Sequence, residues 1–269
     1  MIESARSLPS VWRILNLWIV GIVVVFLLLP ILIVIPSAFN TDPTVTFPIH
    51  GFTLKWFANA ISRAEFIRSF FLSLAVSVIA TLISLAAGGL AAYAIVRRAF
   101  RGKVLLELVL LSPLIFPSIV LAIALTMVLG SLGLLRTVPG LIVAHTIVTL
   151  PYAVRAMIGT FHSIDPHLEE AAAVLGARRV FVWREVLVPL LRPGLLAAAI
   201  FSLIMSFDEF AVSFFVVGPG MTTLPIELFN YTEFYADPTI CAVSTILILL
   251  SALAVLAIER SVGLAKLMS

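Results

Sequence analysis

The main pattern along the chain is a series of long apolar runs without a charged residue. Three of these runs are 28 residues long, at 14–41, 69–96 and 108–135. Two shorter runs follow at 137–154 and 238–258. A helix that crosses a bilayer needs about 20 mostly apolar residues. Each run is therefore a candidate transmembrane helix.

A sixth apolar stretch lies between Arg192 and Glu227, where Asp208 and Glu209 are the only charged residues. Together the runs predict an all-α membrane protein with six transmembrane helices. Their expected bounds are about 15–38, 68–96, 104–130, 138–158, 193–217 and 238–258. The first is expected to be an uncleaved helix, because its apolar stretch is too long for a signal peptide and no clear small-x-small cleavage site follows it.

Composition supports the membrane interpretation. The chain has 269 residues, of which 62% are hydrophobic and 12% charged, whereas a soluble domain is about 45–50% apolar and about 25% charged. This excludes an ordinary soluble enzyme, a disordered chain and a nucleic-acid-binding module. The single cysteine, Cys241, excludes a disulfide framework and a cysteine-rich metal site.

The positive charges predict the orientation of the spans. With the N-terminus inside and six spans, 13 Lys and Arg residues fall inside and 4 outside, as the positive-inside rule requires. The fourth span is interrupted by His145 and Pro151, but without it the Arg-rich segment 178–192 would lie outside. Both termini are therefore expected in the cytoplasm. The net charge of +3 reflects this topology and implies no nucleic-acid partner.

Small residues recur at every fourth position in two of the predicted spans. The positions are Ala80, Ser84, Gly88 and Ala92 in the second span and Gly194, Ala198, Ser202 and Ser206 in the fifth. Such stripes allow helices to approach closely in lipid. They predict tight packing within the chain rather than a dimer face. Kinks are expected at Pro113, Pro117 and Pro151.

The segments between the spans are also informative. One transmembrane domain is expected over residues 1–269, without a low-complexity linker. Residues 40–65 are predicted to form an irregular outer loop with a short interfacial helix around Trp56, and residues 218–237 an acidic outer segment. The longest polar insertion on the predicted cytoplasmic side is at about 161–192.

This cytoplasmic insertion has the signals of a short helix that ends in a tight turn. Asp165 can cap the helix, and Pro166 suits its first position. Glu169 and Glu170 then lie near the positive end of the helix dipole. Gly176 is a natural stop that permits a left-handed turn. A second short helix with aromatic and arginine side chains is expected over Ala177–Glu185, with Pro189 ending it and Pro193 starting the next span.

The same segment resembles the EAA loop of permease subunits of binding-protein-dependent ABC importers. The family pattern is Glu-Ala-Ala, three residues, Gly, nine residues, Ile, one residue and Leu-Pro. The matching residues here are Glu170, Ala171, Ala172, Gly176, Val186, Val188 and Pro189, with Val in place of Ile and of Leu. The resemblance covers residues of about 60–269, and the helix at about 15–38 is an additional element.

The resemblance implies a type I ABC importer permease fold in the bacterial inner membrane. It implies that a separate cytoplasmic ATPase is contacted by the coupling residues Glu169, Glu170, Ala171, Ala172 and Gly176. It also implies a second permease subunit, expected to be a different chain, and an extracytoplasmic solute-binding protein. The chain lacks the pattern Gly-x-x-x-x-Gly-Lys-Ser/Thr. ATP and Mg²⁺ are therefore expected on the ATPase, and no catalytic residue, cofactor or metal on this chain.

Asp208 and Glu209 are the candidate residues of the solute pathway. A carboxylate in mid-helix costs about 2.5–3.5 kcal/mol on insertion scales, so it usually faces protein or water. In a continuous helix the two side chains point about 100° apart, with Glu209 on the small-residue stripe. They form either a negative site for a cationic solute or a structural pair that orders the helices.

Residues 206–225 also resemble the spermidine/putrescine branch of this permease family. This resemblance implies a polyamine or a related small cationic solute. An ATP-independent secondary transporter is an alternative, for which purified protein would take up solute without ATP. A membrane-embedded hydrolase is the enzyme alternative, although the chain has no Gly-x-Ser-x-Gly motif.

Overall fold

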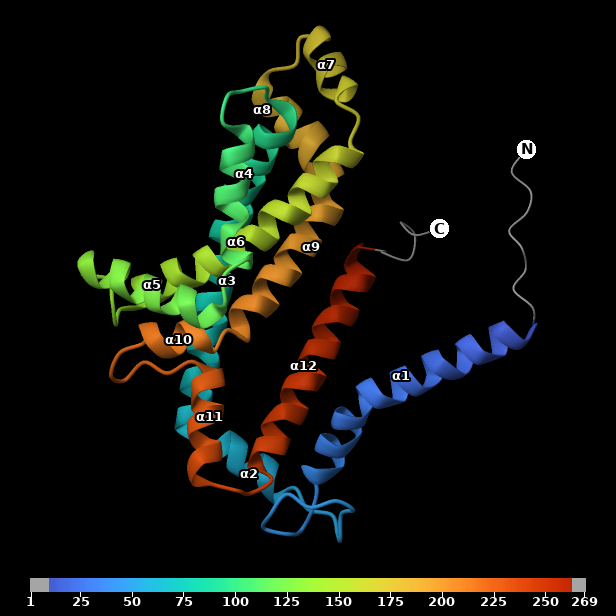
Figure 1. The fold of residues 1–269 in the computed structure, drawn as a ribbon, viewed down its shortest axis with the longest axis vertical. Helices are drawn as coiled ribbons and strands as arrows, with labels where there is room; N and C mark the ends of the chain where they lie inside the picture. The colour runs from blue at the N-terminus through green and yellow to red at the C-terminus, as the bar shows by residue number, and fades with distance from the viewer. Residues whose placement is uncertain (1–9, 263–269) are drawn as a thin grey trace. The chain divides into compact units, whose positions relative to one another are not determined.

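The structure is a computed structural model that describes the backbone of residues 10–262 and the side chains of residues 14–253. Helices joined by loops make up this described part, and it contains no strand (Figure 1). The α-helices are α1 (Ser10–Ser37), α2 (Lys55–Ser62), α3 (Ala64–Arg97), α4 (Lys103–Leu111), α5 (Ser118–Ser131), α6 (Val138–Ser163), α7 (His167–Val174), α8 (Arg179–Phe181), α9 (Val188–Phe207), α10 (Ala211–Val216), α11 (Leu224–Phe234) and α12 (Thr239–Val262).

Contacts divide the chain into two compact units, which we describe separately. The central unit is Ala64–Asn230, and the flanking unit combines Met1–Arg63 with Tyr231–Ser269. The prediction that residues 1–269 act as one membrane domain stays a prediction.

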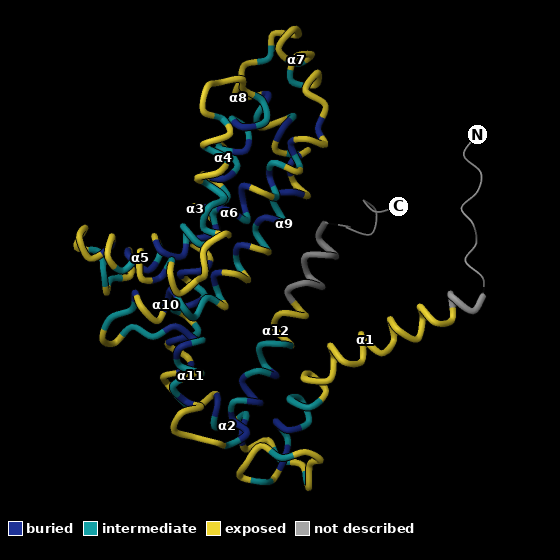
Figure 2. The backbone as a smooth tube through the Cα atoms, viewed as in Figure 1, coloured by how far each residue is buried: buried dark blue, intermediate teal, exposed yellow. Residues whose placement is uncertain are grey.

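Helices α3, α6 and α9 form the core of the central unit, and their facing sides are buried (Figure 2). Both predicted small-residue stripes lie in this contact, since every member of each is buried. The approach at Gly194 is so close that a Cβ there would overlap the Thr160 hydroxyl on α6. The predicted tight packing within the chain is confirmed.

Four helical segments in the described part are long and apolar enough to cross a membrane, or five if a bent helix pair forms one span. The predicted spans at 15–38, 68–96 and 138–158 are confirmed as apolar helices over Ile14–Ser37, Ala64–Arg97 and Val138–Ser163. The predicted sixth span at 238–258 falls partly beyond the described side chains. The number six and the cytoplasmic location of both termini stay predictions.

The third predicted span, at 104–130, is not one helix. A 3-10 turn, Ser112–Leu114, ends α4, and the chain bends by 108° before α5 begins. Pro113 and Pro117 explain the break, because proline donates no backbone hydrogen bond and the residue before it avoids helical geometry. The predicted kink is therefore a sharp break.

The fifth predicted span, at 193–217, differs from the observed helical segment at both ends. One helical segment, Arg179–Phe207, runs through Pro189 and Pro193 and then stops. It includes a π-helical turn, Val182–Leu187, directly before Pro189. Local π turns allow membrane helices to tolerate proline. The prediction that the prolines separate two helices is therefore wrong.

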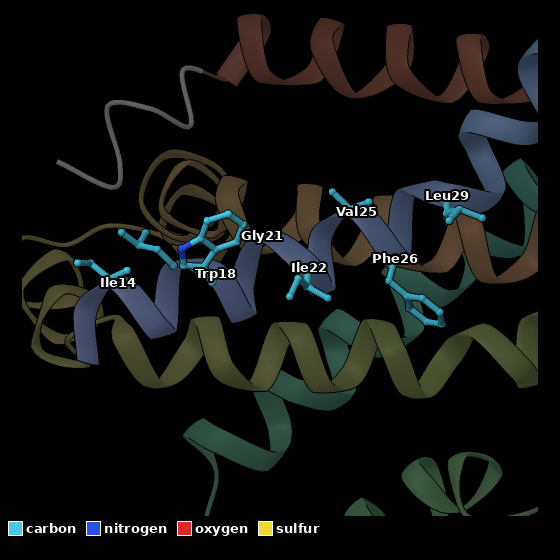
Figure 3. A pocket seen from close by; sticks show the side chains of 8 residues that line it. Ile14, Trp18, Gly21, Ile22, Val25, Phe26 and Leu29 are labelled. Atoms are coloured by element: carbon cyan, nitrogen blue, oxygen red, sulfur yellow. The ribbon is translucent and has the colours of Figure 1, made fainter. Parts of the chain in front are cut away.

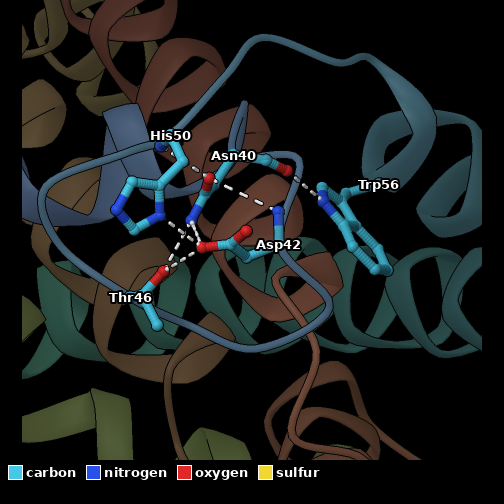
Figure 4. Close-up of polar contacts among 5 residues, drawn as sticks. All are labelled: Asn40, Asp42, Thr46, His50 and Trp56. Atoms are coloured by element: carbon cyan, nitrogen blue, oxygen red, sulfur yellow. Dashed lines mark hydrogen bonds and ion pairs between the residues drawn. The ribbon is translucent and has the colours of Figure 1, made fainter.

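In the flanking unit, α2 confirms the short helix expected around Trp56. The preceding loop is ordered by the buried side chain of Asn40 (Figure 4). Its amide nitrogen donates to Thr46 Oγ1 (2.8 Å), and its backbone carbonyl accepts from the Trp56 indole (2.7 Å). The Asp42 carboxylate accepts from His50 and Thr46, and these bonds lower its pKa.

Helix α1 presents an almost continuous apolar surface. A shallow groove of about 630 Å³ follows one of its faces, between Ile14 and Leu29 (Figure 3). Its lining is almost entirely apolar, which suits a helix in contact with lipid or with another membrane helix. Helix α11 lies within the outer segment 218–237 and was not predicted. Pro225 occupies its first turn, where a missing N–H is tolerated.

Candidate coupling and solute sites

The segment that resembles the EAA loop folds as a short helix followed by a glycine turn. The carboxylate of Asp165 accepts the backbone N–H of His167 at 2.9 Å, which caps the start of α7. Gly176 has φ of +81°, in the left-handed region that favours glycine. The predicted capping and the predicted left-handed turn are both confirmed.

Glu169 points toward the body of the central unit. Its carboxylate accepts from Arg97 Nε at 2.8 Å and from the Tyr93 hydroxyl at 3.3 Å, both on α3. Arg97 also donates to the backbone carbonyl of Ile164, at 2.8 Å. The side chains of Arg97 and Glu169 are only 11% and 17% exposed. The ion pair therefore ties α7 to the end of α3.

Aromatic side chains reinforce this attachment. The Tyr93 ring contacts the rings of Phe161 and Trp183, with centroids 5.7 Å and 4.7 Å away. The guanidinium of Arg97 lies 5.9 Å from the Phe161 ring centroid. Trp183 belongs to the π-helical turn, so this cluster joins α3, α6 and the segment that leads into α9.

Glu170 points the other way. Its side chain is 71% exposed, and within the described part of the chain it pairs with the exposed His167, 3.0 Å away. The hydrogen bond to this carboxylate raises the pKa of His167. Of the two alanines in the motif, Ala171 is exposed and Ala172 packs against the core. The outer face of α7 is thus acidic and open.

The tip of the segment is apolar and exposed. Val174 and Leu175, directly before Gly176, are each 87% exposed, and Val180 after the turn is 77% exposed. Large apolar side chains grouped at a surface mark contact sites for another molecule. Together with Glu170, they give the segment an outward surface suited to a protein partner.

The candidate solute residues lie at a break between two helices. Helix α9 ends at Phe207, and α10 begins at Ala211. Glu209 Oε1 accepts the backbone N–H of Val212 at 3.0 Å, so this carboxylate caps α10. Acidic side chains favour a helix start and oppose a helix end, which explains why the predicted continuous helix stops here.

Asp208 and Glu209 have different surroundings. Asp208 is exposed, and within the described part of the chain its carboxylate makes no hydrogen bond or ion pair. Phe210, the residue after Glu209, has its ring centroid 5.4 Å from that of Phe214 and 5.2 Å from that of Phe229. An exposed carboxylate is thus followed, two residues later in the chain, by an aromatic cluster that the sequence reasoning missed. The Phe-rich run after Glu209 was its only sequence signal.

The two candidate sites lie at opposite ends of α9. Figure 1 shows α7 and α8 at one end of α9 and α10 at the other. Among the residues with described side chains, no group of three or more His, Cys, Asp or Glu could hold a metal ion. The chemistry available is therefore charge, hydrogen bonding and aromatic contact.

Residues 84–264 match the family described as "Binding-protein-dependent transport system inner membrane component". The chain belongs to this family. The permease is thus a multi-pass inner-membrane protein of an ABC importer, and such permeases are transport components rather than enzymes.

Two curated relatives illustrate the similarity. The permease is 31% identical over 234 residues to the spermidine/putrescine transport system permease protein PotC of Escherichia coli, covering 86% of this chain and 88% of that protein. It is 26% identical over 253 residues to the putrescine transport system permease protein PotI of the same species, covering 90% and 89%.

Solved structures confirm the type I importer permease fold. A chain in the crystal structure of a bacterial ABC transporter involved in the import of the acidic polysaccharide alginate matches with a TM-score of 0.75 at 17% identity, covering 97% of the permease and 99% of that chain. A chain in the crystal structure of an amino acid ABC transporter with histidines matches with a TM-score of 0.58 at 19% identity, and the match covers 78% of the permease and 100% of that chain.

Proposed function

We propose that the permease forms the pathway for a polyamine or a related small organic cation, driven by ATP hydrolysis on separate cytoplasmic subunits. A second, different permease chain and an extracytoplasmic solute-binding protein complete the proposed importer. ATP and Mg²⁺ are held by the ATPase subunits, so this chain needs no cofactor.

The observation that carries the coupling part of the proposal is the division of roles on α7. Glu169 is tied to Arg97 of α3, whereas Glu170 and the apolar tip at Val174 and Leu175 are open. A movement of a partner that grips the outer surface would thus pass through Glu169 into the core helices. This gives Glu170, Ala171 and Gly176 a docking role, and Glu169 and Ala172 a supporting role inside the chain.

The solute class is supported by the exposed carboxylate of Asp208 and by the aromatic ring of Phe210, two residues later in the chain. Carboxylates attract ammonium groups, and aromatic faces bind organic cations through their electron-rich rings. The similarity to PotC and PotI, whose names specify spermidine and putrescine, points to the same class. Glu209 adds negative charge while one of its oxygens caps α10.

A charge reversal tests the coupling surface. In the importer assembled with its ATPase, Glu170→Lys is expected to abolish ATP-driven uptake while the protein still inserts into the membrane. The matched control is Glu233→Lys, an exposed acid on α11 outside the segment, which should transport normally. Unchanged uptake by Glu170→Lys would refute the docking role. Uptake by the purified chain without ATP would refute the importer mechanism.

Neutral amides test the solute site. Asp208→Asn is expected to lower uptake of a divalent organic cation such as putrescine by about tenfold or more, because an ion-pairing contact of about 1.4 kcal/mol corresponds to this factor. The ATPase rate of the assembled importer should stay within about twofold, a difference of about 0.4 kcal/mol. Normal uptake of every cationic solute by Asp208→Asn would assign the carboxylate a structural role.

A further inference from the structure

A buried histidine joins α6 to both helices that flank the break at residues 208–210. The side chain of His145 is 2% exposed. Its Nδ1 lies 2.8 Å from Ser206 Oγ, near the end of α9, and its Nε2 lies 2.9 Å from Ser213 Oγ, in α10. Both serines are also buried. One imidazole ring therefore bonds to the helix on each side of the break.

The contacts of Ser213 indicate which ring nitrogen carries the hydrogen. Ser213 Oγ lies 2.7 Å from the backbone carbonyl oxygen of Glu209, which can only accept. The single hydroxyl hydrogen of Ser213 is therefore donated to this carbonyl, and His145 Nε2 must donate to Ser213. In a neutral ring Nδ1 is then the acceptor, and Ser206 donates to it.

The hydrogen bonds thus form a directed series that ends at the break itself. It runs from the Ser206 hydroxyl through the His145 ring to Ser213, and from there to the carbonyl of Glu209. On α6, Thr149 Oγ1 donates to the backbone carbonyl of His145 at 2.9 Å. Ionisable side chains such as histidine are rare within membrane spans, where they usually face the interior of the bundle and have a polar partner.

The alternative to the break is the continuous helix through residues 208–210 that the sequence predicted. In that arrangement Ser206 and Ser213 would lie seven residues apart, about 10.5 Å along one helix at about 1.5 Å per residue. A single imidazole cannot bond to both across this distance. The His145 contacts therefore stabilise the broken conformation specifically.

We propose that His145 is the positioning residue of the solute site. By holding Ser206 and Ser213, it keeps the chain broken at residues 208–210, so that Asp208 is exposed while Glu209 caps α10. This inference rests on the proposed function of Asp208 as a solute-contacting carboxylate. His145 itself does not contact solute, because its ring is enclosed by the helices.

Cysteine accessibility in the complete importer tests this proposal. In a Cys241→Ala background, a cysteine is introduced by Asp208→Cys or, as the buried control, by Val212→Cys. A charged, membrane-impermeant methanethiosulfonate reagent should modify the first thiol at least about tenfold faster, which corresponds to about 1.4 kcal/mol. Adding His145→Leu should reduce this ratio to about twofold or less, a difference of about 0.4 kcal/mol.

Two further variants separate positioning from the mere satisfaction of buried hydroxyls. His145→Gln keeps one donor and one acceptor in the site, so it should retain most of the reactivity difference. The triple variant His145→Leu, Ser206→Ala, Ser213→Ala removes the three bonded side chains together, so no hydroxyl or imidazole is left unpaired and only the Glu209 carbonyl loses its donor. Its folding should therefore be less impaired than that of His145→Leu. The triple variant should still lose the difference in modification rate between the two thiols, because no side chain then joins α9 to α10 across the break.

The outcomes distinguish the two proposals. Equal, slow modification of both thiols in the presence of His145 would refute the aqueous exposure of position 208, and with it the proposed solute role. Rapid modification of the Asp208→Cys thiol in the presence of His145, and equally rapid modification in the triple variant, would overturn only the positioning role. The positioning role of His145 is supported if His145→Leu and the triple variant lose the difference in thiol modification rate and His145→Gln retains it.

Discussion

The division of roles on α7 makes a quantitative prediction about two adjacent glutamates. Glu169→Gln removes the charge of a carboxylate that pairs with Arg97 in a mostly buried contact, whereas Glu170→Gln changes an exposed side chain. Both substitutions preserve size and the capacity for hydrogen bonds. The two variants therefore differ mainly in the burial and the partner of the charge they remove.

The magnitude for Glu169→Gln follows from the geometry of its contacts. Breaking a fully buried ion pair costs about 3–5 kcal/mol. Here glutamine can still accept from Arg97, and Arg97 keeps its bond to the carbonyl of Ile164. We therefore expect a loss of about 2 kcal/mol, because a hydrogen bond to a charged group exceeds a neutral one by about this amount or less. The detached population of α7 should rise about 30-fold.

Hydrogen exchange of the purified permease measures this population. Peptides that cover His167–Val174 should exchange about 30-fold faster in Glu169→Gln, under conditions where reclosing is faster than chemical exchange so that the rate follows the open population. Glu170→Gln should exchange like the parent protein in the same peptides. Similar exchange in the two variants, or none faster than the parent, would refute the inference that Glu169 anchors α7.

Three further predictions concern other parts of the chain. Gly176→Val should prevent co-purification of the ATPase, whereas Gly176→Asn should largely keep it, since the left-handed conformation costs most side chains about 1–2 kcal/mol but suits asparagine. Gly194→Ala should lower the melting temperature in detergent by overpacking worth about 1–3 kcal/mol. Gly159→Ala, with no atom within 4 Å of the new Cβ, should not lower it. Acidification should loosen the loop around Asp42, which hydrogen exchange can measure. The pKa of Asp42 in the folded protein lies below its ordinary value of 3.8, so the stability that the ionised carboxylate contributes is fully present above pH 3.8. This stability is lost as the pH falls through the lowered pKa.

The apolar runs were sufficient to predict α1, α3 and α6, because a span is determined by local hydrophobicity. They did not reveal the end of α9 at Phe207, because the run between Arg192 and Glu227 is apolar except for Asp208 and Glu209 and was interpreted as one continuous span. The break depends on contacts between positions 61 and 68 residues apart, where His145 meets Ser206 and Ser213. Such contacts leave no periodic signal in one sequence.

The candidate coupling site shows a similar limit. Capping by Asp165 and the turn at Gly176 follow from residue type alone, and both were predicted. The opposite orientations of Glu169 and Glu170 depend on Arg97, which lies 72 residues before Glu169. The positive charge at the end of a span was visible in the sequence, but its partner was not.

The helical segment Arg179–Phe207 links the two candidate sites mechanically. Its 29 residues make a rod of about 43 Å at about 1.5 Å per residue. If the part beyond the π-helical turn, the 20 residues Val188–Phe207 with a length of about 30 Å, pivots by about 5°, its far end is displaced by about 2.6 Å. The π-helical turn near the coupling end is the natural pivot, because its wide turn is less constrained than the α-helical remainder. A lever of this length would convert a slight rocking at the ATPase contact into opening or closing around residues 208–210.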